Sequence, residues 1–343
     1  MRAVVMRRRG GPEVLSYETD FPDPVIGPEE VLIRVRACGM NHLDLFTREG
    51  EQGVRPPLPH ILGMEAAGDV VAVGERVTGV RVGDRVLPPP HIACGRCEWC
   101  RRGLENLCPH MQVLGRTRHG GYAELLAVPD RNILVLPPQM SYEQAAAFTV
   151  AFGTAWHMLV TRGRVQPGET VLILAAGSVV GSAAIQVAKL FGCRVIATAS
   201  TDEKLEKAKA LGADEVINYT QERFDRRARK LTDGRGVDLV IEHVGADTWK
   251  QSVAALAPMG RIVTCGSTTG RWGETDLWSL FGKQLSLIGS FGATYGELMQ
   301  VLPLVVEGKL QPVIDRTFPL EQAADAHRYL ADRRQFGKVV LTI

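Results

Sequence analysis

The pattern of apolar and polar positions divides the chain into two parts. The first contains short strand-like runs, and in the second apolar strands alternate with helices. Up to about residue 140, short β-branched runs such as Val31–Ala37, Ala67–Val73 and Arg131–Leu136 are separated by Gly, Pro and Asp. Short strands bounded by turn residues are typical of all-β units. This part is therefore predicted to be an irregular, barrel-like β unit rather than a single flat sheet.

From Ser141 onward, apolar strands alternate with helices. Ser141 and Gln144 have the spacing of a capping box, which predicts the start of an Ala-rich helix over residues 145–160. The strand–helix alternation that follows predicts a parallel, doubly wound sheet, and the fold class is therefore α/β. The predicted strands are Thr170–Leu174, Arg194–Thr198, Glu215–Asn218, Val237–Ile241, Gly260–Thr264 and Leu285–Gly289, and the first two helices between them are Ser182–Phe191 and Asp202–Leu211.

Four of the seven cysteines form the pattern C-x2-C-x2-C-x7-C. Four thiolates around one tetrahedral ion make a closed structural zinc site, so the pattern predicts one zinc per chain. An iron–sulfur cluster is one alternative, but ferredoxins have a three-residue final gap and usually a second cysteine set. Disulfides are the other, and they are rare in a chain without an export signal. The predicted ligands are Cys94, Cys97, Cys100 and Cys108.

Charge and hydropathy restrict the partners. The formal net charge of +2 indicates neither nucleic acid nor an anionic membrane as a partner. No apolar stretch reaches the ~20 residues of a membrane span, and the N-terminal apolar run is too short for a secretory signal. We expect a cytoplasmic protein that acts on a small molecule and forms a homo-dimer or homo-tetramer.

A turn of small residues, Ala175–Gly181, follows the first strand of the parallel part and leads directly into a helix. Such a turn brings backbone N–H groups and a helix N-terminus against a pyrophosphate. The fingerprint is degenerate, because Ala, Ser and Val stand where glycines are common, and a plain strand–helix turn is the alternative. The residues predicted to bind the pyrophosphate are Gly177, Ser178, Val179 and Val180.

The end of the next strand indicates which cofactor is preferred. NAD-binding proteins commonly place an acidic residue there for the ribose hydroxyls. This chain has Ser200 and Thr201 instead, with Lys204 beyond them. Hydroxyls and an ammonium suit a 2′-phosphate, so NADP(H) is favoured. In the alternative interpretation, Ser200 and Thr201 cap the next helix and Lys204 is merely solvated.

Taken together, these parts resemble the medium-chain dehydrogenase/reductase superfamily, in its zinc alcohol dehydrogenase and quinone oxidoreductase group. The resemblance covers essentially the whole chain. It implies a GroES-like β-barrel substrate domain over residues 1–143 with the zinc lobe at 94–108. It also implies a Rossmann NAD(P)-binding domain over 144–289 and a C-terminal part, 290–343, that returns to the substrate domain. The resemblance rests on Ala37–Asp44, Gly63–Gly74, Val82–Val86, Gly120–Glu124, Val216–Tyr219 and the four-cysteine lobe.

The chain departs from the zinc alcohol dehydrogenases at their second, catalytic zinc. Its Cys, His and Cys ligands would fall at Asn41, Met64 and near Val150, and the Ser/Thr that relays the alcohol proton would fall at Leu43. An amide, a thioether and an isopropyl group cannot replace two thiolates and an imidazole. Of the family residues around this zinc site, only the glutamate that follows the missing His is present, as Glu65. The resemblance therefore implies an enzyme that lacks the catalytic metal.

The quinone oxidoreductase branch, by contrast, has an arrangement like Cys38–Asp44 and no catalytic zinc. In members of that branch, the residues that match Lys204 and Tyr219 contact the 2′-phosphate of NADP. The resemblance adds a set of residues expected beside the nicotinamide, namely His243, Val244, Gly266 and Ser267.

The sequence thus predicts an NADPH-dependent oxidoreductase that transfers a hydride to a quinone, an enone or a reactive carbonyl. Asn41 is the predicted catalytic residue, holding the nicotinamide ribose or polarising the substrate, and structural support is its alternative role. Two other functions stay open: an NAD(P)-dependent alcohol dehydrogenase, and an NADP-binding or structural protein with little turnover.

Overall fold

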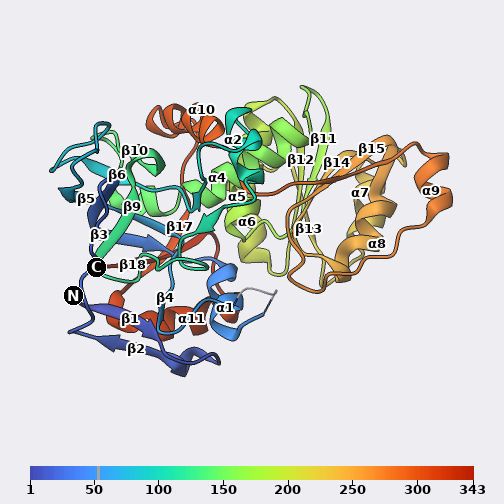
Figure 1. Ribbon diagram of the computed structural model, residues 1–343. Helices are drawn as coiled ribbons and strands as arrows, with labels where there is room; N and C mark the ends of the chain where they lie inside the picture. The colour runs from blue at the N-terminus through green and yellow to red at the C-terminus, as the bar shows by residue number, and fades with distance from the viewer. Residues whose placement is uncertain (52–54) are drawn as a thin grey trace. The chain divides into compact units, whose positions relative to one another are not determined.

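The computed structural model describes residues 1–51 and 55–343 (Figure 1). The chain forms two compact units: unit 1 is Met1–Val150 with Pro312–Ile343, and unit 2 is Ala151–Gln311. Unit 1 is mostly β-structure and unit 2 is a parallel sheet with helices, which confirms the predicted α/β fold class. Of the described helices, none is long and apolar enough to span a bilayer.

Unit 1 is built on largely antiparallel sheets. Its strands are β1 (Ala3–Met6), β2 (Leu15–Glu18), β3 (Glu30–Gly39), β4 (His60–Ile61), β5 (Glu65–Val73), β6 (Arg85–Leu87), β7 (His91–Ile92), β8 (Gln112–Val113), β9 (Leu125–Pro129), β10 (Leu134–Val135), β17 (Ile314–Pro319) and β18 (Lys338–Thr342). The largest sheet has the order β10-β6-β5-β3-β18-β17, with β9 also paired to β3. Val31, Ile33 and Val35 of β3 are buried at alternate positions, so the central strand contributes one apolar face to the core.

The helices of unit 1 are α1 (His42–Glu49), α2 (Glu98–Arg101), α3 (Tyr142–Ala146) and α11 (Ala323–Ala331). Ser141 caps α3 as predicted, because its Oγ accepts the Gln144 N–H at 3.2 Å. The single helix predicted over 145–160 is wrong. It is broken into α3, α4 (Thr149–Trp156) and a π-helical turn over His157–Arg162. At the break, the Val150 N–H donates to the buried Glu65 carboxylate at 2.7 Å, a tertiary contact that helical periodicity does not reveal.

Unit 2 contains all six predicted strands. They are β11 (Thr170–Ile173), β12 (Arg194–Ala199), β13 (Glu215–Asn218), β14 (Val237–Glu242), β15 (Leu256–Thr264) and β16 (Ser286–Gly289), and the helices are α5 (Val179–Leu190), α6 (Asp202–Ala210), α7 (Phe224–Leu231), α8 (Ala246–Ala255), α9 (Leu277–Gly282) and α10 (Tyr295–Val306). The sheet is parallel in the order β13-β12-β11-β14-β15-β16. The strand order reverses between β11 and β14, where doubly wound sheets bind their ligands.

The unit boundaries differ from the predicted ones. Residues 290–311 belong to unit 2 rather than to the part that returns to the β unit, and residues 144–150 belong to unit 1. Helix α10 is held in unit 2 because its Glu297 carboxylate lies 2.8 Å from His157 Nδ1 in a buried pair. Helix α10 also packs closely against α4 at Gly153, because a Cβ at Gly153 would lie 2.9 Å from a Leu298 methyl group.

Candidate functional site

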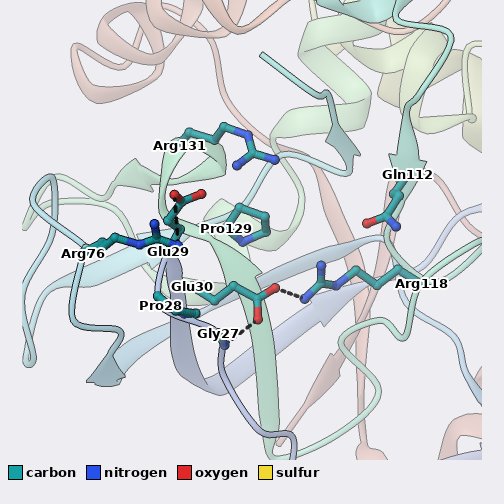
Figure 2. Close-up of a pocket in the computed structure, with 9 residues that line it drawn as sticks. All are labelled: Gly27, Pro28, Glu29, Glu30, Arg76, Gln112, Arg118, Pro129 and Arg131. Carbon is teal, nitrogen blue, oxygen red and sulfur yellow. Dashed lines mark hydrogen bonds and ion pairs between the residues drawn. The ribbon is translucent and has the colours of Figure 1, made fainter. Parts of the chain in front are cut away.

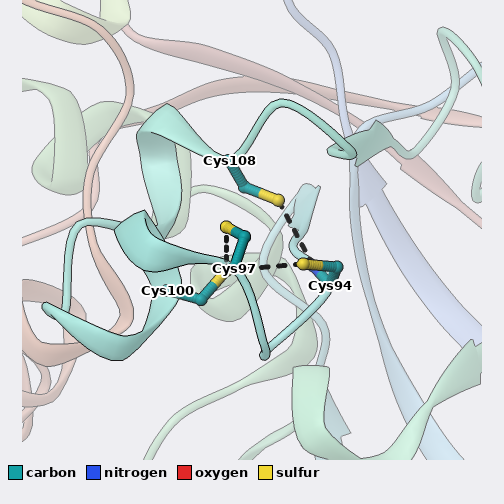
Figure 3. A group of neighbouring side chains, drawn as sticks. All are labelled: Cys94, Cys97, Cys100 and Cys108. Atoms are coloured by element: carbon teal, nitrogen blue, oxygen red, sulfur yellow. Dashed lines mark hydrogen bonds between the residues drawn. The ribbon is translucent and has the colours of Figure 1, made fainter.

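The four predicted zinc ligands converge in unit 1 (Figure 3). Their sulfur atoms all lie within 4.8 Å of one another. The Cys97–Cys100 and Cys94–Cys100 sulfur distances are 3.4 and 3.9 Å. A tetrahedral ion with Zn–S bonds of about 2.3 Å places its sulfurs about 3.8 Å apart. The donor set therefore fits a structural zinc ion.

Local backbone geometry forms this cluster. Gly95, at φ +74°, reverses the chain between Cys94 and the N-cap of α2, Cys97. Backbone N–H groups of Arg96 and Cys97 lower the pKa of the Cys94 thiol to about 6. Burial and the Cys97 hydrogen bond raise the pKa of Cys100 to about 12. Thiols crowded in this way do not all ionise unless a cation neutralises them.

In unit 2, the turn between β11 and α5 has the geometry of a phosphate-binding loop. Ser178 is the N-cap of α5, and its Oγ accepts the Gly181 N–H at 2.9 Å. A Cβ at Gly181 would lie 2.4 Å from the Ala175 carbonyl oxygen, so only glycine permits this approach of helix to turn. The N–H groups of Val179 and Val180 have no acceptor within the helix. They are available to an anion at the helix N-terminus. Helix α5 begins three residues earlier than predicted, at Val179.

The residues predicted beside the nicotinamide lie at the same edge of the sheet. His243, after β14, lies 2.9 Å from Ser178 Oγ through its Nε2. Burial lowers the pKa of His243 to about 4, so its imidazole is neutral at pH 7. A Cβ at Gly266 would lie 2.7 Å from the His243 carbonyl oxygen, and one at Gly245 would lie 2.9 Å from Ser267 Cα. The structure thus brings together the ends of β14 and β15 and the turn after β11.

Sequence reasoning missed Glu242, which shapes this edge. Its fully buried carboxylate accepts the Val244 and Gly245 N–H groups at 2.7 and 3.1 Å. It also accepts the Thr248 and Ser252 hydroxyls at 2.9 and 2.7 Å. An acidic residue at the end of an otherwise apolar strand was the available signal, because a buried carboxylate requires several donors.

Of the predicted 2′-phosphate residues, Ser200 and Tyr219 directly follow β12 and β13, and Lys204 lies in the first turn of α6. The Tyr219 N–H donates to the Ala199 carbonyl at 3.2 Å, which brings Tyr219 beside Ser200. Thr201, not Ser200, caps α6, where its Oγ1 accepts the Lys204 N–H at 3.3 Å. The nearby Asp202 carboxylate accepts the Asn218 side-chain N–H at 3.0 Å.

Asn41 lies in a buried polar cluster at one end of the largest sheet of unit 1. Its Nδ2 donates to Glu65 Oε2 at 3.0 Å, and its Oδ1 accepts from Lys338 Nζ at 2.9 Å. Lys338 also forms an ion pair with Glu65. Sequence reasoning missed Lys338. The signal was a lysine that begins the apolar strand Lys338–Thr342.

This cluster does not fit a catalytic zinc ion. Asn41 and Glu65 hydrogen-bond to each other, Met64 offers a buried thioether, and the Val150 backbone N–H is bonded to Glu65. The cation already beside Glu65 is the Lys338 ammonium. Zinc sites are built from thiolates, imidazoles and carboxylates, and the one such ligand among these residues is paired with a lysine.

A depression of about 300 Å³ in unit 1 contains none of the predicted residues (Figure 2). Its Glu30 carboxylate accepts from Arg118 at 2.5 Å and from the Gly27 N–H at 2.9 Å. Its Glu29 carboxylate lies 3.6 Å from Arg76. Both acids are paired with arginines, so this depression is neither a metal site nor an acid–base site.

The chain matches two families of known proteins. Residues 179–307 match the family described as zinc-binding dehydrogenase, and residues 27–138 match the alcohol dehydrogenase GroES-like domain. The chain is 36% identical to a quinone oxidoreductase of Pseudomonas aeruginosa over 97% of this chain and 96% of that protein. It is 32% identical to an NAD-dependent alcohol dehydrogenase of Sulfolobus acidocaldarius, with both chains covered completely.

The similar solved structures are also alcohol dehydrogenases and quinone oxidoreductases. An NAD-dependent alcohol dehydrogenase has a TM-score of 0.96 and 49% identity, and the match covers both chains completely. A quinone oxidoreductase of Pseudomonas syringae pv. Tomato DC3000 has a TM-score of 0.83 and 33% identity, over 100% of this chain and 99% of that one. Similarity alone does not separate quinone reduction from alcohol oxidation.

Proposed function

Because the chain belongs to the medium-chain dehydrogenase/reductase superfamily and is thus an NAD(P)-dependent oxidoreductase, we propose that it reduces quinones, enones or reactive carbonyls with NADPH. We further propose that it does so without catalytic zinc. The observation that carries this proposal is the buried cluster of Asn41, Glu65 and Lys338, in which an ammonium is the cation beside the acid.

NADPH, when bound, supplies a hydride. The N–H groups of Val179 and Val180, at the N-terminus of α5, would hold its pyrophosphate. Ser200, Lys204 and Tyr219 would hold its 2′-phosphate. This role is supported by the position of Ser200 and Tyr219 directly after β12 and β13 and of Lys204 in the first turn of α6. The engagement of Asp202 with Asn218 also supports NADP over NAD, because that carboxylate already has a partner.

The four cysteines would hold one structural zinc ion. Four thiolates leave no open position on the ion, so it would supply no chemistry to the reaction. Its role would be to stabilise the lobe from Cys94 to Cys108, which contains only one short helix, α2, and one 3₁₀ turn.

Asn41 would act on the substrate oxygen. Its amide has two N–H groups, and the contact with Glu65 uses one of them. The other can donate to a carbonyl oxygen as negative charge develops there. A quinone or an enone spreads this charge over its own conjugated system, so positioning and one donor suffice. An aliphatic alcohol, by contrast, requires a group that stabilises an alkoxide, such as zinc.

The first expected result concerns substrates. NADPH oxidation should be about 10²-fold or more faster with a benzoquinone or an α,β-unsaturated ketone than with cyclohexanone, because only the former are activated by conjugation. Elemental analysis of the same sample should give one zinc per chain. Fast ethanol oxidation that a chelator abolishes and zinc restores, with the four-cysteine lobe still loaded, would instead identify a zinc alcohol dehydrogenase. Absence of turnover with all of these substrates would indicate an NADP-binding protein.

The second expected result concerns the cofactor. Lys204→Ala should weaken NADPH binding by about 10- to 100-fold and leave NADH binding unchanged, because a charge-assisted hydrogen bond to the 2′-phosphate is lost. Lys207→Ala is the matched control on the same helix, where Lys207 pairs with Glu203 at 2.8 Å. Fluorescence titration measures both affinities. Equal affinity of the parent protein for NADH and NADPH would contradict the proposed preference.

An apolar surface at the edge of the unit 2 sheet supports the expected homo-dimer or homo-tetramer. Strand β16 ends the sheet, so one of its sides has no neighbouring strand in this order. On α9, the helix that precedes β16 in the chain, Leu277, Trp278 and Phe281 are 69%, 75% and 62% exposed. Exposed apolar side chains beside a sheet edge are typical of surfaces that associate.

A further inference from the structure

Lys338 is a buried lysine at the edge of the largest sheet of unit 1 where β3 ends and β5 and β18 begin. Strands β5, β3 and β18 are neighbours in the sheet, with Glu65 opposite Gly39 and Leu341 opposite Cys38. This register brings Glu65 and Lys338 to either side of Asn41, which follows β3. The side chains of Lys338 and Glu65 are each 1% exposed.

The chemistry of the neighbours fixes the orientation of the Asn41 carboxamide. A lysine ammonium only donates hydrogen bonds and a carboxylate only accepts them. The Asn41 carbonyl oxygen must therefore face Lys338 Nζ, at 2.9 Å, and its NH₂ must face Glu65 Oε2, at 3.0 Å. Turning the carboxamide over would place donor against donor and acceptor against acceptor.

Glu65 is itself held rigidly. Its second oxygen, Oε1, accepts the Thr149 hydroxyl at 2.8 Å and the Val150 N–H at 2.7 Å. Gly39 provides room for the lysine stem, because a Cβ there would lie 3.3 Å from Lys338 Cδ and 1.9 Å from the Ala146 carbonyl oxygen. The backbone around the cluster is thus adapted to these side chains.

Folding alone does not require this arrangement. Removing two charges from water is costly, and well-packed apolar residues in place of a buried ion pair are often at least as stable. A buried pair that fixes the orientation of one amide therefore points to a role for that amide beyond packing.

We propose that Lys338 is a positioning residue: together with Glu65 it holds the Asn41 carboxamide so that its second N–H is presented to the carbonyl oxygen of the substrate. This inference rests on the proposed reductase function. The ammonium also polarises the amide through its carbonyl oxygen, and a polarised amide is a stronger N–H donor. Lys338 itself does not contact the substrate.

The test is a double-mutant cycle of Lys338→Met and Asn41→Ala, with kcat and KM measured for an enone and for a high-potential quinone. Each single change should lower kcat for the enone by about 10- to 100-fold, because a donor to the developing oxyanion is lost or misdirected. In the Asn41→Ala background, Lys338→Met should have no further effect on kcat, since it acts through Asn41. The kcat for the quinone should fall less than the kcat for the enone, because the quinone depends less on the Asn41 N–H donor. Lys309→Met, at an exposed lysine that pairs with Glu307 at 2.8 Å, is the control and should leave both rates unchanged.

A second variant covers the case in which Lys338→Met alone does not fold. Glu65→Gln combined with Lys338→Met removes both charges, and the introduced glutamine amide then offers an N–H from the side where Glu65 now accepts. The Asn41 carboxamide should turn over, and kcat for the enone should stay low although the protein folds. A neutron crystal structure of this double variant without cofactor, which distinguishes the nitrogen of a carboxamide from its oxygen, reads the orientation of the amide independently of activity.

Multiplicative losses in the cycle, or a double variant with a reversed amide and full enone activity, would overturn the role of Lys338. A parent protein that reduces neither the enone nor the quinone would instead overturn the proposed function. In that case an unturned amide in the crystal structure would also reject the positioning role.

Discussion

Replacing Glu65 with alanine is expected to lower the free energy of unfolding by about 3–5 kcal/mol. The change leaves the Lys338 ammonium buried with Asn41 Oδ1 as its described partner. It also removes the acceptor of the Thr149 hydroxyl and the Val150 N–H. Each of these groups loses a hydrogen bond in a place where water does not easily replace it. Urea denaturation of the parent protein and the variant measures the difference.

The control is Glu307→Ala, which breaks another Lys–Glu pair. Glu307 and Lys309 lie 2.8 Å apart with side chains 52% and 55% exposed. An exposed pair of this kind contributes only about 0–1 kcal/mol. Similar losses for the two variants would contradict the buried, interdependent character of the cluster around Asn41.

The stability of the protein is expected to fall as the pH is lowered from about 6.5 toward 4, because buried histidines cannot accept protons in the folded state. Burial, with a smaller contribution from the Arg48 charge, lowers the pKa of His327 to about 3. Burial also lowers the pKa of His60 to about 4. Both values lie below the ordinary 6.5, so the unfolded chain binds protons first. Each histidine then contributes a slope of up to about 1.4 kcal/mol per pH unit.

Asp44 opposes this trend. Burial raises the pKa of its carboxyl to about 6, although the Asn41 and Gly63 N–H groups lower it. The folded state therefore holds this proton more tightly, and its contribution to stability is lost as the pH rises through 6. Asp44 offsets one histidine between about pH 4 and 6. The pKa of His243 is also lowered to about 4, so the loss from the remaining histidines persists there.

His327→Gln isolates the histidine contribution. The Gln side-chain oxygen can accept the hydrogen bond that Arg48 Nη1 makes to His327 Nδ1 at 2.9 Å, but the side chain does not titrate. The slope of unfolding free energy against pH, from urea denaturation between pH 7.5 and 5, should decrease in the variant, by up to about 1.4 kcal/mol per unit at the acid end of this range, where the unfolded histidine is almost fully protonated. Identical slopes in the two proteins would reject the assignment, and acid release of bound zinc would affect both equally.

The features that the sequence determined by itself are local. The four thiols converge because short spacings and a glycine reversal bring them together within one lobe. The six strands of unit 2 and the turn at Ser178 follow from apolar runs, a capping residue and Gly181, each read within a short window. The resemblance grouped His243 and Gly266, and the fold agrees with this grouping because the ends of parallel strands meet at one edge.

Only the tertiary structure decided what surrounds Asn41. Lys338 lies 297 positions away along the chain, and sheet register, not spacing, brings its ammonium to the amide. The break between α3 and α4 has the same origin, because Glu65 binds the Val150 N–H across 85 positions. A lysine and a glutamate are expected in water, and no local pattern reveals that both are buried against each other. The sequence could identify the missing zinc ligands, but long-range packing supplied the charged pair that holds Asn41 in their place.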